Sequence, residues 1–152
     1  MTGLGTPVTT TVPLFDFLPG QSYRRPEDPT APPCPTTCAE LGAEIYPAGF
    51  RAVLREAGAY HLPVYVTENG LADGDDDQRA GYLVEHLRVL RGVMRDRLAR
   101  VRGYFAWSLM DNFEWSSGYQ PRFGFFTLGR AERPSASVFR RIARFGVLPA
   151  GH

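Results

Sequence analysis

The sequence of 152 residues contains no lysine, and all 17 of its basic residues are arginines. These arginines are scattered among 16 Asp and Glu residues, which leaves a formal net charge of +1. A protein that binds nucleic acid usually concentrates its positive charge on one stretch or one face. The charge pattern therefore predicts no nucleic-acid partner, and we interpret the exclusive use of arginine as a compositional bias.

Metal-binding and disulfide-forming residues are also scarce. Cys34 and Cys38 form a C-x3-C pair, but no second cysteine pair and no nearby histidine accompany it. This spacing predicts neither a zinc site nor a disulfide framework. We expect His61 to flank a strand or helix, His86 to lie at an exposed helical position and His152 to end the chain. No metal and no cofactor are therefore expected.

Long hydrophobic runs are absent, although 43% of the residues are hydrophobic, which is enough for the core of one globular domain. The first 20 residues lack the basic start and the continuous apolar segment of a secretory signal. No window reaches the length that spans a bilayer. We therefore expect no contact with membranes and a cytoplasmic location.

Proline is concentrated in one part of the sequence, residues 1–39, where no period of 2 or 3.6 is sustained. We expect irregular structure there. From residue 40 onward, strand and helix patterns alternate. The sequence therefore predicts two regions, an irregular Pro-rich segment over residues 1–39 and an ordered part over residues 40–148.

Three helices are expected in the ordered part. Pro47 suits the first position of a helix over residues 47–57, and Gly58 could supply a left-handed C-cap. A second helix is expected over about residues 78–98, and a third begins after Pro134 and ends at Gly146. The expected buried faces consist of Leu83, Leu87, Leu90 and Met94 in the second helix and of Val138, Phe139, Ile142 and Phe145 in the third.

Two near-continuous apolar segments separate these helices. They are "LPVYVTE", residues 62–68, and "VRGYFAWSLM", residues 101–110. Such segments are typical of strands that are buried on both faces in parallel sheets. The order helix, strand, helix, strand, helix predicts an α/β fold built from βα units.

Candidate functional residues follow the two strands. "TENG", residues 67–70, offers Glu68, and "WSLMDNFEW", residues 107–115, offers Trp107, Glu114 and Trp115. In α/β barrels the functional groups lie where the strands end. Carboxylates beside aromatic rings suit a sugar, because the rings stack on its apolar faces and the carboxylates accept its hydroxyl groups. The acidic turn Asp73–Asp77 could suggest calcium, but its spacing favours a solvated, helix-capping turn.

Three blocks of the sequence together resemble a known family. The blocks are "EIYPAGF", "VYVTENGLADGDDDQRAGYLVEHL" and "VRGYFAWSLMDNFEWSSGYQPRFGF". They are similar to consecutive signature blocks of glycoside hydrolase family 1, the retaining β-glucosidases and β-galactosidases, and most of all to its archaeal and actinobacterial branch. The resemblance covers roughly residues 40–146. It implies the C-terminal portion of a (β/α)8 TIM barrel, with the last two βα units and the preceding helix, and thus an incomplete barrel.

The resemblance also implies roles for five residues. Glu68 matches the catalytic nucleophile, which forms a glycosyl-enzyme intermediate. Trp107 matches the floor of the sugar site. Glu114 and Trp115 match the pair that holds the outer hydroxyls of the non-reducing sugar, and Phe123 matches a flanking aromatic wall. Without the resemblance, Glu68 and Glu114 could be solvated acids, and the aromatic residues could simply pack for stability.

One required group has no counterpart in the sequence. A retaining glycosidase needs a second carboxyl group roughly 5 Å from the nucleophile as its general acid and base. In the resembled family this group belongs to an Asn-Glu-Pro block, whereas the only asparagines here are Asn69 and Asn112. A complete barrel also needs about 250 residues. We therefore expect a β-glycoside as the substrate by resemblance, but an isolated chain with little or no activity.

Two other interpretations remain open. The chain could be a non-catalytic sugar-binding module that completes a barrel supplied by another polypeptide, whose missing N-terminal portion would then be its partner. It could also be a degenerate or truncated reading frame without a function of its own. The sequence does not distinguish glucosides from galactosides.

Overall fold

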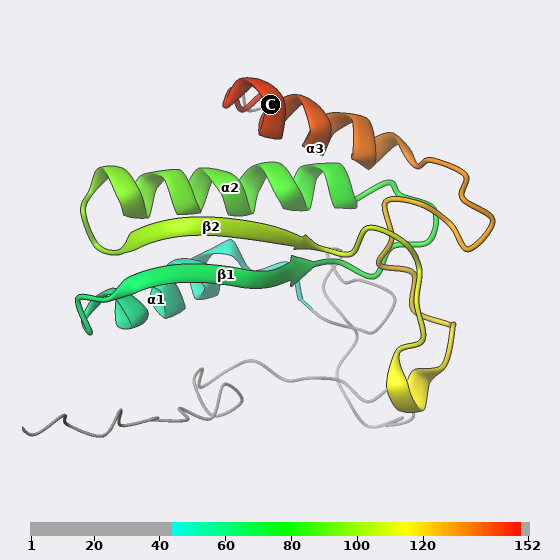
Figure 1. Ribbon diagram of the computed structural model, residues 1–152, viewed down its shortest axis with the longest axis horizontal. Helices are drawn as coiled ribbons and strands as arrows, with labels where there is room; N and C mark the ends of the chain where they lie inside the picture. The colour runs from blue at the N-terminus through cyan, green and yellow to red at the C-terminus, as the bar shows by residue number, and fades with distance from the viewer. Residues whose placement is uncertain (1–43, 150–152) are drawn as a thin grey trace, which may run out of the picture.

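The computed structural model describes residues 44–149, which form a two-stranded parallel sheet and three helices (Figure 1). In chain order the elements are α1 (Pro47–Gly58), β1 (Pro63–Gly70), α2 (Arg79–Arg95), β2 (Arg100–Trp107), the 3-10 turn η1 (Trp115–Ser117) and α3 (Pro134–Phe145). The predicted order of elements and the α/β class are confirmed. The predicted irregular segment, residues 1–39, lies outside the described residues, as do both cysteines.

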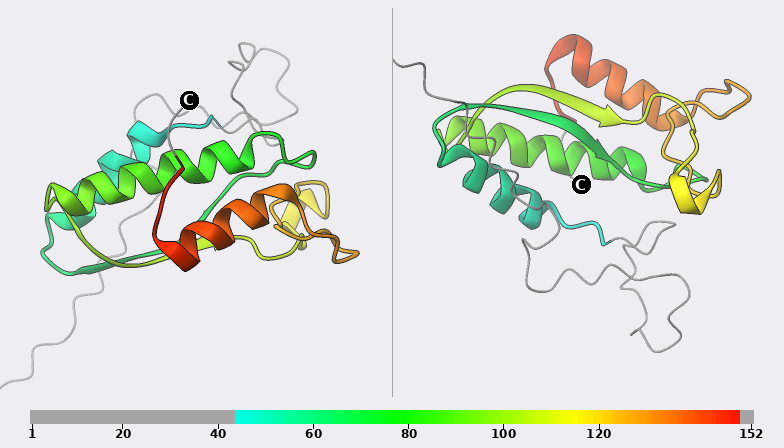
Figure 2. Two further views of the ribbon diagram at one scale, coloured as in Figure 1. Left: turned by 90° about the horizontal axis from the view of Figure 1, so that it is seen from above. Right: turned by 60° about the horizontal axis from the view of Figure 1, so that its bottom comes forward.

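The helices form one layer against the sheet. α2 packs between α1 and α3, and α1 and α2 lie along the same face of β1 and β2 (Figures 1 and 2). One core cluster, which joins α1, α2 and the two strands, contains Leu54, Val66, Val93, Ala99 and Val101. A second cluster joins α2 and α3 to the segments that follow the strands, and it contains Leu71, Tyr82, Leu83, Phe125 and Ala136. No helix among the described residues is long and apolar enough to cross a membrane.

The described helices cover only one face of the sheet, so the expectation of strands buried on both faces is wrong for the part of the chain that the structure describes. Val66 and Val101 face the helices and are buried, whereas Tyr65 is 59% exposed and Phe105 60% exposed on the opposite side. The aromatic, β-branched sequence is that of strands within a larger sheet. Among the described residues, two strands and three helices provide nothing that could cover the second face.

The sheet is parallel but irregular. Val64 pairs with Val101 and Tyr65 with Gly103, so Arg102 is an extra residue on β2. A second shift, between Val66 and Asn69, places the extra residue on β1. These β-bulges re-aim the side chains that follow them. The second bulge includes Glu68, the candidate nucleophile.

Two expected helix ends differ from those observed. Gly58 lies inside α1 rather than in a left-handed cap, and His61 has the positive φ of 57° instead. A Cβ at Gly58 would come within 1.8 Å of the Leu98 carbonyl oxygen, so glycine is required there for close packing. α2 ends at Arg95 rather than near residue 98, since Arg97 has a φ of 56°.

The end of α2 is a Schellman motif. The Leu98 N–H donates to the Val93 carbonyl at 2.9 Å, and the Arg97 N–H donates to the Met94 carbonyl at 3.1 Å. These are the two bonds that define this motif. Arginine occupies the left-handed position where glycine is common, so no pattern in the sequence marks the stop. α3, by contrast, ends as predicted at Gly146, which has a φ of 65°.

The buried faces of α2 and α3 also differ from expectation. His86, predicted to be exposed, is 4% exposed, whereas Met94 is 46% exposed. Phe145 is exposed as well, and Ile142 is buried as predicted. The side of α2 that faces the core carries Arg79, Tyr82, Leu83, His86 and Val93. Of the buried polar side chains, Arg79 donates hydrogen bonds to the segments that follow both strands, and His86 bonds to the Tyr82 carbonyl within the helix.

Candidate active site

The candidate residues gather at the C-terminal edge of the sheet. Because the strands are parallel and Gly70 pairs with Trp107, both strands end at the same edge. A Cβ at Gly70 would lie 1.8 Å from the Trp107 carbonyl oxygen, so the glycine of "TENG" allows this close approach. Glu68 lies two residues before Gly70, and its side chain is exposed. The sheet therefore brings Glu68 and Trp107 to one edge.

Asn69, next to Glu68, is held by two phenols, that of the buried Tyr82 and that of the half-buried Tyr104. The Tyr104 hydroxyl donates a hydrogen bond of 2.8 Å to Asn69 Oδ1. Burial raises the pKa of Tyr82 to about 12, opposed by its hydrogen bond with Asn69. Burial also raises the pKa of Tyr104. Both phenols therefore stay protonated at neutral pH, and the backbone beside Glu68 is anchored to the core.

Trp107 and Glu114 form a second part of the site. The indole N–H of Trp107 donates to Glu114 Oε1 at 3.2 Å, and both side chains are half-buried. This hydrogen bond orients Oε1 of the Glu114 carboxylate and does not involve the second carboxylate oxygen. An oriented carboxylate beside an indole ring suits a hydroxylated ligand with one apolar face.

The other two predicted residues are less closely joined to this pair. Trp115, in η1, is 87% exposed. The side chain of Phe123 is half-buried, and its carbonyl oxygen accepts a hydrogen bond from the Ser108 N–H at 3.1 Å. The structure thus brings Glu68, Trp107 and Glu114 to one region and leaves Trp115 on an open surface.

A buried ion pair fixes the segment that carries Trp107 and Glu114. Asp111 accepts hydrogen bonds from Arg133 Nη1 at 2.9 Å and Nη2 at 3.0 Å, and from the Gly124 N–H at 2.8 Å. Arg133 also donates to the Gly124 carbonyl at 2.7 Å. Bidentate arginine–carboxylate pairs fix geometry as well as charge. The sequence pattern assigned no role to Asp111, and it did not single out Arg133.

The segment that follows β1 is held by a second buried cation. Arg79 is 1% exposed and donates to the carboxylate of Asp76 and to the backbone carbonyls of Leu71, Asp73 and Arg122. Asp76 in turn accepts hydrogen bonds of 2.7 Å from the N–H and the hydroxyl of Ser135. Burial lowers the pKa of Arg79, and the neighbouring Asp76 and Asp73 oppose this effect. This network, which the sequence also did not reveal, links the segments after β1 and β2 to the start of α3.

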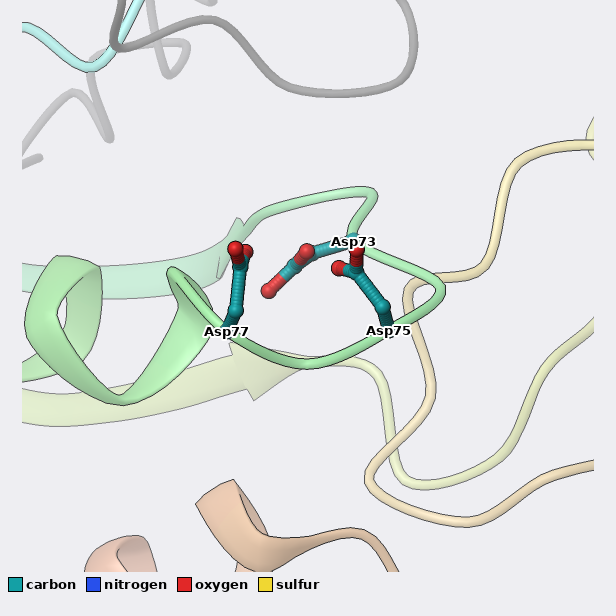
Figure 3. A group of neighbouring side chains, drawn as sticks. All are labelled: Asp73, Asp75 and Asp77. Carbon is teal, nitrogen blue, oxygen red and sulfur yellow. The ribbon is translucent and has the colours of Figure 1, made fainter.

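The acidic turn between β1 and α2 is mainly structural. Oxygen atoms of Asp73, Asp75 and Asp77 lie within 4.8 Å of one another (Figure 3). Asp73 is buried and accepts hydrogen bonds from the N–H groups of Gln78 and Arg79 at 3.0 and 2.8 Å. Burial raises the pKa of Asp73, and the hydrogen bond with Asp73 lowers the pKa of Asp75. Asp73 thus caps the start of α2, as expected for the turn Asp73–Asp77. The expectation that this turn is solvated is wrong for Asp73 and Asp76, which are both buried.

Comparison with known proteins decides the family. The sequence profile described as "Glycosyl hydrolase family 1" matches residues 23–145. The chain belongs to glycosyl hydrolase family 1. This confirms the resemblance found in the three sequence blocks. The profile match begins inside the Pro-rich segment, and the domain boundary after residue 39 stays a prediction.

The relatives are enzymes that are much longer than this chain. A β-galactosidase of Pyrococcus woesei is 38% identical over 145 residues, which are 90% of this chain and 28% of the relative. Beta-glucosidase 16 of Arabidopsis thaliana is 43% identical over 115 residues, 66% of this chain and 22% of the relative. The chain therefore spans about a quarter of the length of these family 1 relatives.

A solved family member shows the same arrangement of elements. The structure of a hyperthermophilic β-glucosidase from Pyrococcus furiosus matches with a TM-score of 0.70 and 42% identity, over 74% of this chain and 25% of the enzyme. The prediction of one portion of a barrel is thus confirmed, since two strands are present and no closed barrel forms among the described residues.

Proposed function

We propose that this chain supplies the nucleophile and part of the sugar site for hydrolysis of β-glycosides with retention, with a β-glucoside or β-galactoside as the substrate. The observation that carries the proposal is the exposed carboxylate of Glu68 at the sheet edge where β2 ends in Trp107. Family membership supports the reaction class. The named relatives include a β-galactosidase and a β-glucosidase.

In the proposed reaction, a carboxylate oxygen of Glu68 attacks the anomeric carbon. The bond from that carbon to the leaving oxygen breaks, and a general acid protonates the leaving group. Water then attacks the same carbon, passes its proton to the same acid/base group and releases Glu68 as a carboxylate. No metal or cofactor is required for either step.

The remaining proposed roles concern sugar binding. The Trp107 indole forms the floor on which the sugar stacks, and its N–H keeps Glu114 Oε1 in place. Glu114 then accepts sugar hydroxyls through its second oxygen. Trp115 and Phe123 complete the aromatic surround, and the exposure of Trp115 is consistent with a side chain that packs only when the rest of the site is assembled.

The general acid is the missing part of this site. The sequence has no Asn-Glu-Pro block, and the described structure has two strands where the family's barrel has eight. Protonation of the leaving group is therefore not provided by the residues assigned here. We expect the isolated chain to hydrolyse aryl β-glycosides slowly or not at all.

A fusion experiment separates the chemistry of Glu68 from the missing barrel. In it, this chain replaces the matched segment of the Pyrococcus woesei β-galactosidase, so that all other parts of a family 1 enzyme are present. The fusion should hydrolyse an aryl β-galactoside, and Glu68→Gln should lower kcat on the order of 10⁴-fold because it removes the attacking group.

Glu56→Gln provides the matched control, since Glu56 is an exposed carboxylate on α1. It should leave kcat unchanged. An active, folded fusion in which Glu68→Gln behaves like Glu56→Gln would exclude Glu68 as the nucleophile.

A further inference from the structure

The β-bulge near the end of β1 leaves Glu68 outside the regular strand pairing. Val66 pairs with Tyr104 and Asn69 pairs with Ala106, so β1 advances by three residues while β2 advances by two. A bulge disrupts the local ladder of hydrogen bonds and leaves the extra residue unpaired. Regular sheet geometry alone therefore does not fix the direction of the Glu68 side chain.

Both ends of the Asn69 carboxamide have a phenol as their partner. Asn69 Oδ1 accepts the hydrogen bond of 2.8 Å from the Tyr104 hydroxyl. Burial raises the pKa of Tyr82, and a hydrogen bond with Asn69 opposes this rise, which is the effect of a donor that stabilises the phenolate. The Asn69 amide nitrogen therefore donates to the Tyr82 oxygen. One side chain is thus held from β2 and from α2.

The two phenols are well packed against other elements. Tyr82 is buried in the core cluster that joins α2 and α3, and its ring centroid lies 3.9 Å from that of His86. Tyr104 packs against the core cluster that joins α1 and α2 to the strands, and its ring centroid lies 6.3 Å from that of Phe139 in α3. The position of the Asn69 amide is therefore set by the packing of the helices on the sheet.

The phenols and Glu68 lie on opposite sides of β1. Asn69 bonds to Tyr82, which belongs to α2, so the Asn69 side chain is on the face that the helices cover. Successive side chains of a strand point to opposite faces, and Glu68 is exposed. Tyr82 and Tyr104 can therefore act on Glu68 only through the backbone that Asn69 shares with it.

We propose that Asn69, Tyr104 and Tyr82 are positioning residues for Glu68. The two phenols hold the Asn69 amide, and the backbone of Asn69 directs the Glu68 carboxylate toward the anomeric carbon. This inference rests on the proposed function, because it takes Glu68 as the nucleophile. A displacement of about 1 Å can lower a reaction rate on the order of 10²-fold, so the direction of this carboxylate should affect the rate of attack.

Tyr104→Phe in the fusion enzyme tests the proposal, because it removes one hydroxyl and keeps the ring. The substrate is an aryl β-galactoside whose poor leaving group makes attack by Glu68 the slow step. We expect kcat to fall roughly tenfold and KM to change by less than about twofold. Asn69→Leu removes both hydrogen bonds at a similar volume and should lower kcat on the order of 10²-fold. The double variant should lose no more than Asn69→Leu alone, because Tyr104 acts through Asn69.

Two control variants separate positioning from stability. Tyr60→Phe removes the hydroxyl of a tyrosine that is 57% exposed, and it should leave kcat unchanged. Ile142→Val deletes a methylene group from the buried side of α3, so it should lower the free energy of unfolding without lowering kcat. If Tyr104→Phe lowers kcat no more than Ile142→Val does, its role is structural only and the proposal is wrong.

Hydrogen exchange of the full chain provides a measurement that does not need activity. Tyr104→Phe should speed the exchange of the amides of residues 67–70 roughly fivefold, because one hydrogen bond that holds this segment is lost. The amides of residues 86–92, in the middle of α2, should exchange as before. Unchanged exchange of residues 67–70 would overturn the proposal whether or not the fusion is active.

The remaining outcomes distinguish this proposal from the proposed function. If Glu68→Gln abolishes hydrolysis but Tyr104→Phe and Asn69→Leu behave like Tyr60→Phe, the positioning role is excluded and the proposed function stands. If Tyr104→Phe speeds the exchange but the fusion is inactive, or is active without Glu68, the hold on Asn69 is upheld and the proposed function is contradicted.

Discussion

At the scale of single residues, buried polar groups determine how the candidate site is held. Asp111, Arg133 and Arg79 are all buried, and each has charged and backbone partners. Breaking a buried pair by removing one partner costs more than the pair itself contributes, because the other charge stays buried alone. Glu68 differs from these residues, since it is exposed and its position comes from the backbone around it.

Replacement of Asp111 should therefore be strongly destabilising. Asp111→Ala leaves the buried Arg133 without its carboxylate and should lower the free energy of unfolding by about 3–5 kcal/mol. The exposed pair between Arg140 and Glu132 provides the control, and Glu132→Ala should cost less than about 1 kcal/mol. Urea unfolding of the two variants measures both values. Equal effects would contradict the role given to Asp111.

His86 should make stability depend on pH. Burial lowers the pKa of His86 below its ordinary value of 6.5, and this effect exceeds the opposing ones of the hydrogen bond with Tyr82 and the charge of Glu85. The unfolded chain therefore takes up a proton at a higher pH than the folded chain does. The free energy of unfolding should therefore decrease as the pH falls below the pKa of His86 in the unfolded chain, with a slope of at most about 1.4 kcal/mol per pH unit.

The matching variant is His86→Gln, which does not titrate and can still donate to the Tyr82 carbonyl. Urea unfolding of the wild type and the variant at several pH values between 7 and 5 measures how the free energy of unfolding of each depends on pH. As the pH falls, the free energy of unfolding of the wild type should decrease relative to that of the variant. A difference that stays constant with pH would contradict the burial effect.

At the scale of elements, two glycines of the helices should respond in opposite ways to the same change. A Cβ at Gly58 would meet the Leu98 carbonyl oxygen, whereas nothing lies within 4 Å of a Cβ at Gly81. Gly58→Ala should therefore destabilise the chain by about 1–3 kcal/mol through overpacking. Gly81→Ala should stabilise it by about 0.5–1 kcal/mol, because alanine favours the helix. Thermal unfolding distinguishes the two, and a stabilised Gly58→Ala would show that α1 does not pack on Leu98 as described.

The sequence predicted the elements better than it predicted their ends. The apolar segments and the Pro47, Pro134 and Gly146 signals located the strands and helices, because these patterns are local. The end of α2 was missed because Arg97 adopts a left-handed conformation that is unusual for arginine. The buried side of α2 was also missed, since the helix buries Arg79 and His86, which a hydrophobic pattern assigns to the surface.

The site could be predicted only in part. Glu68, Trp107 and Glu114 lie in continuous blocks, so the resemblance of those blocks was sufficient to select them. The contacts that hold them join distant residues, such as Ser135 with Asp76 and Arg133 with Asp111. A single sequence contains no periodic signal for such pairs, because the partners are brought together only by the packing of α2 and α3.

At the scale of the whole molecule, the described part of the chain has one covered face and one open one. Tyr65 and Phe105 project from the open face of the sheet, and a groove lined by residues 64–71 follows the edge of β1 that has no partner strand within the described sheet. Both features are those of a segment of a larger parallel sheet. The catalytic proposal has the same basis, since Glu68 needs a general acid that a complete barrel would supply.

A trapping experiment on the fusion enzyme tests directly whether Glu68 is the nucleophile. A 2-deoxy-2-fluoro β-galactoside with a good leaving group should form a glycosyl-enzyme that accumulates, because the fluorine slows hydrolysis of the intermediate while the reactive leaving group keeps its formation fast. Proteolysis and mass spectrometry then locate the sugar. We predict a single adduct on the Glu68 carboxylate and none in Glu68→Gln. An adduct on another residue, or an active fusion that forms none, would contradict it.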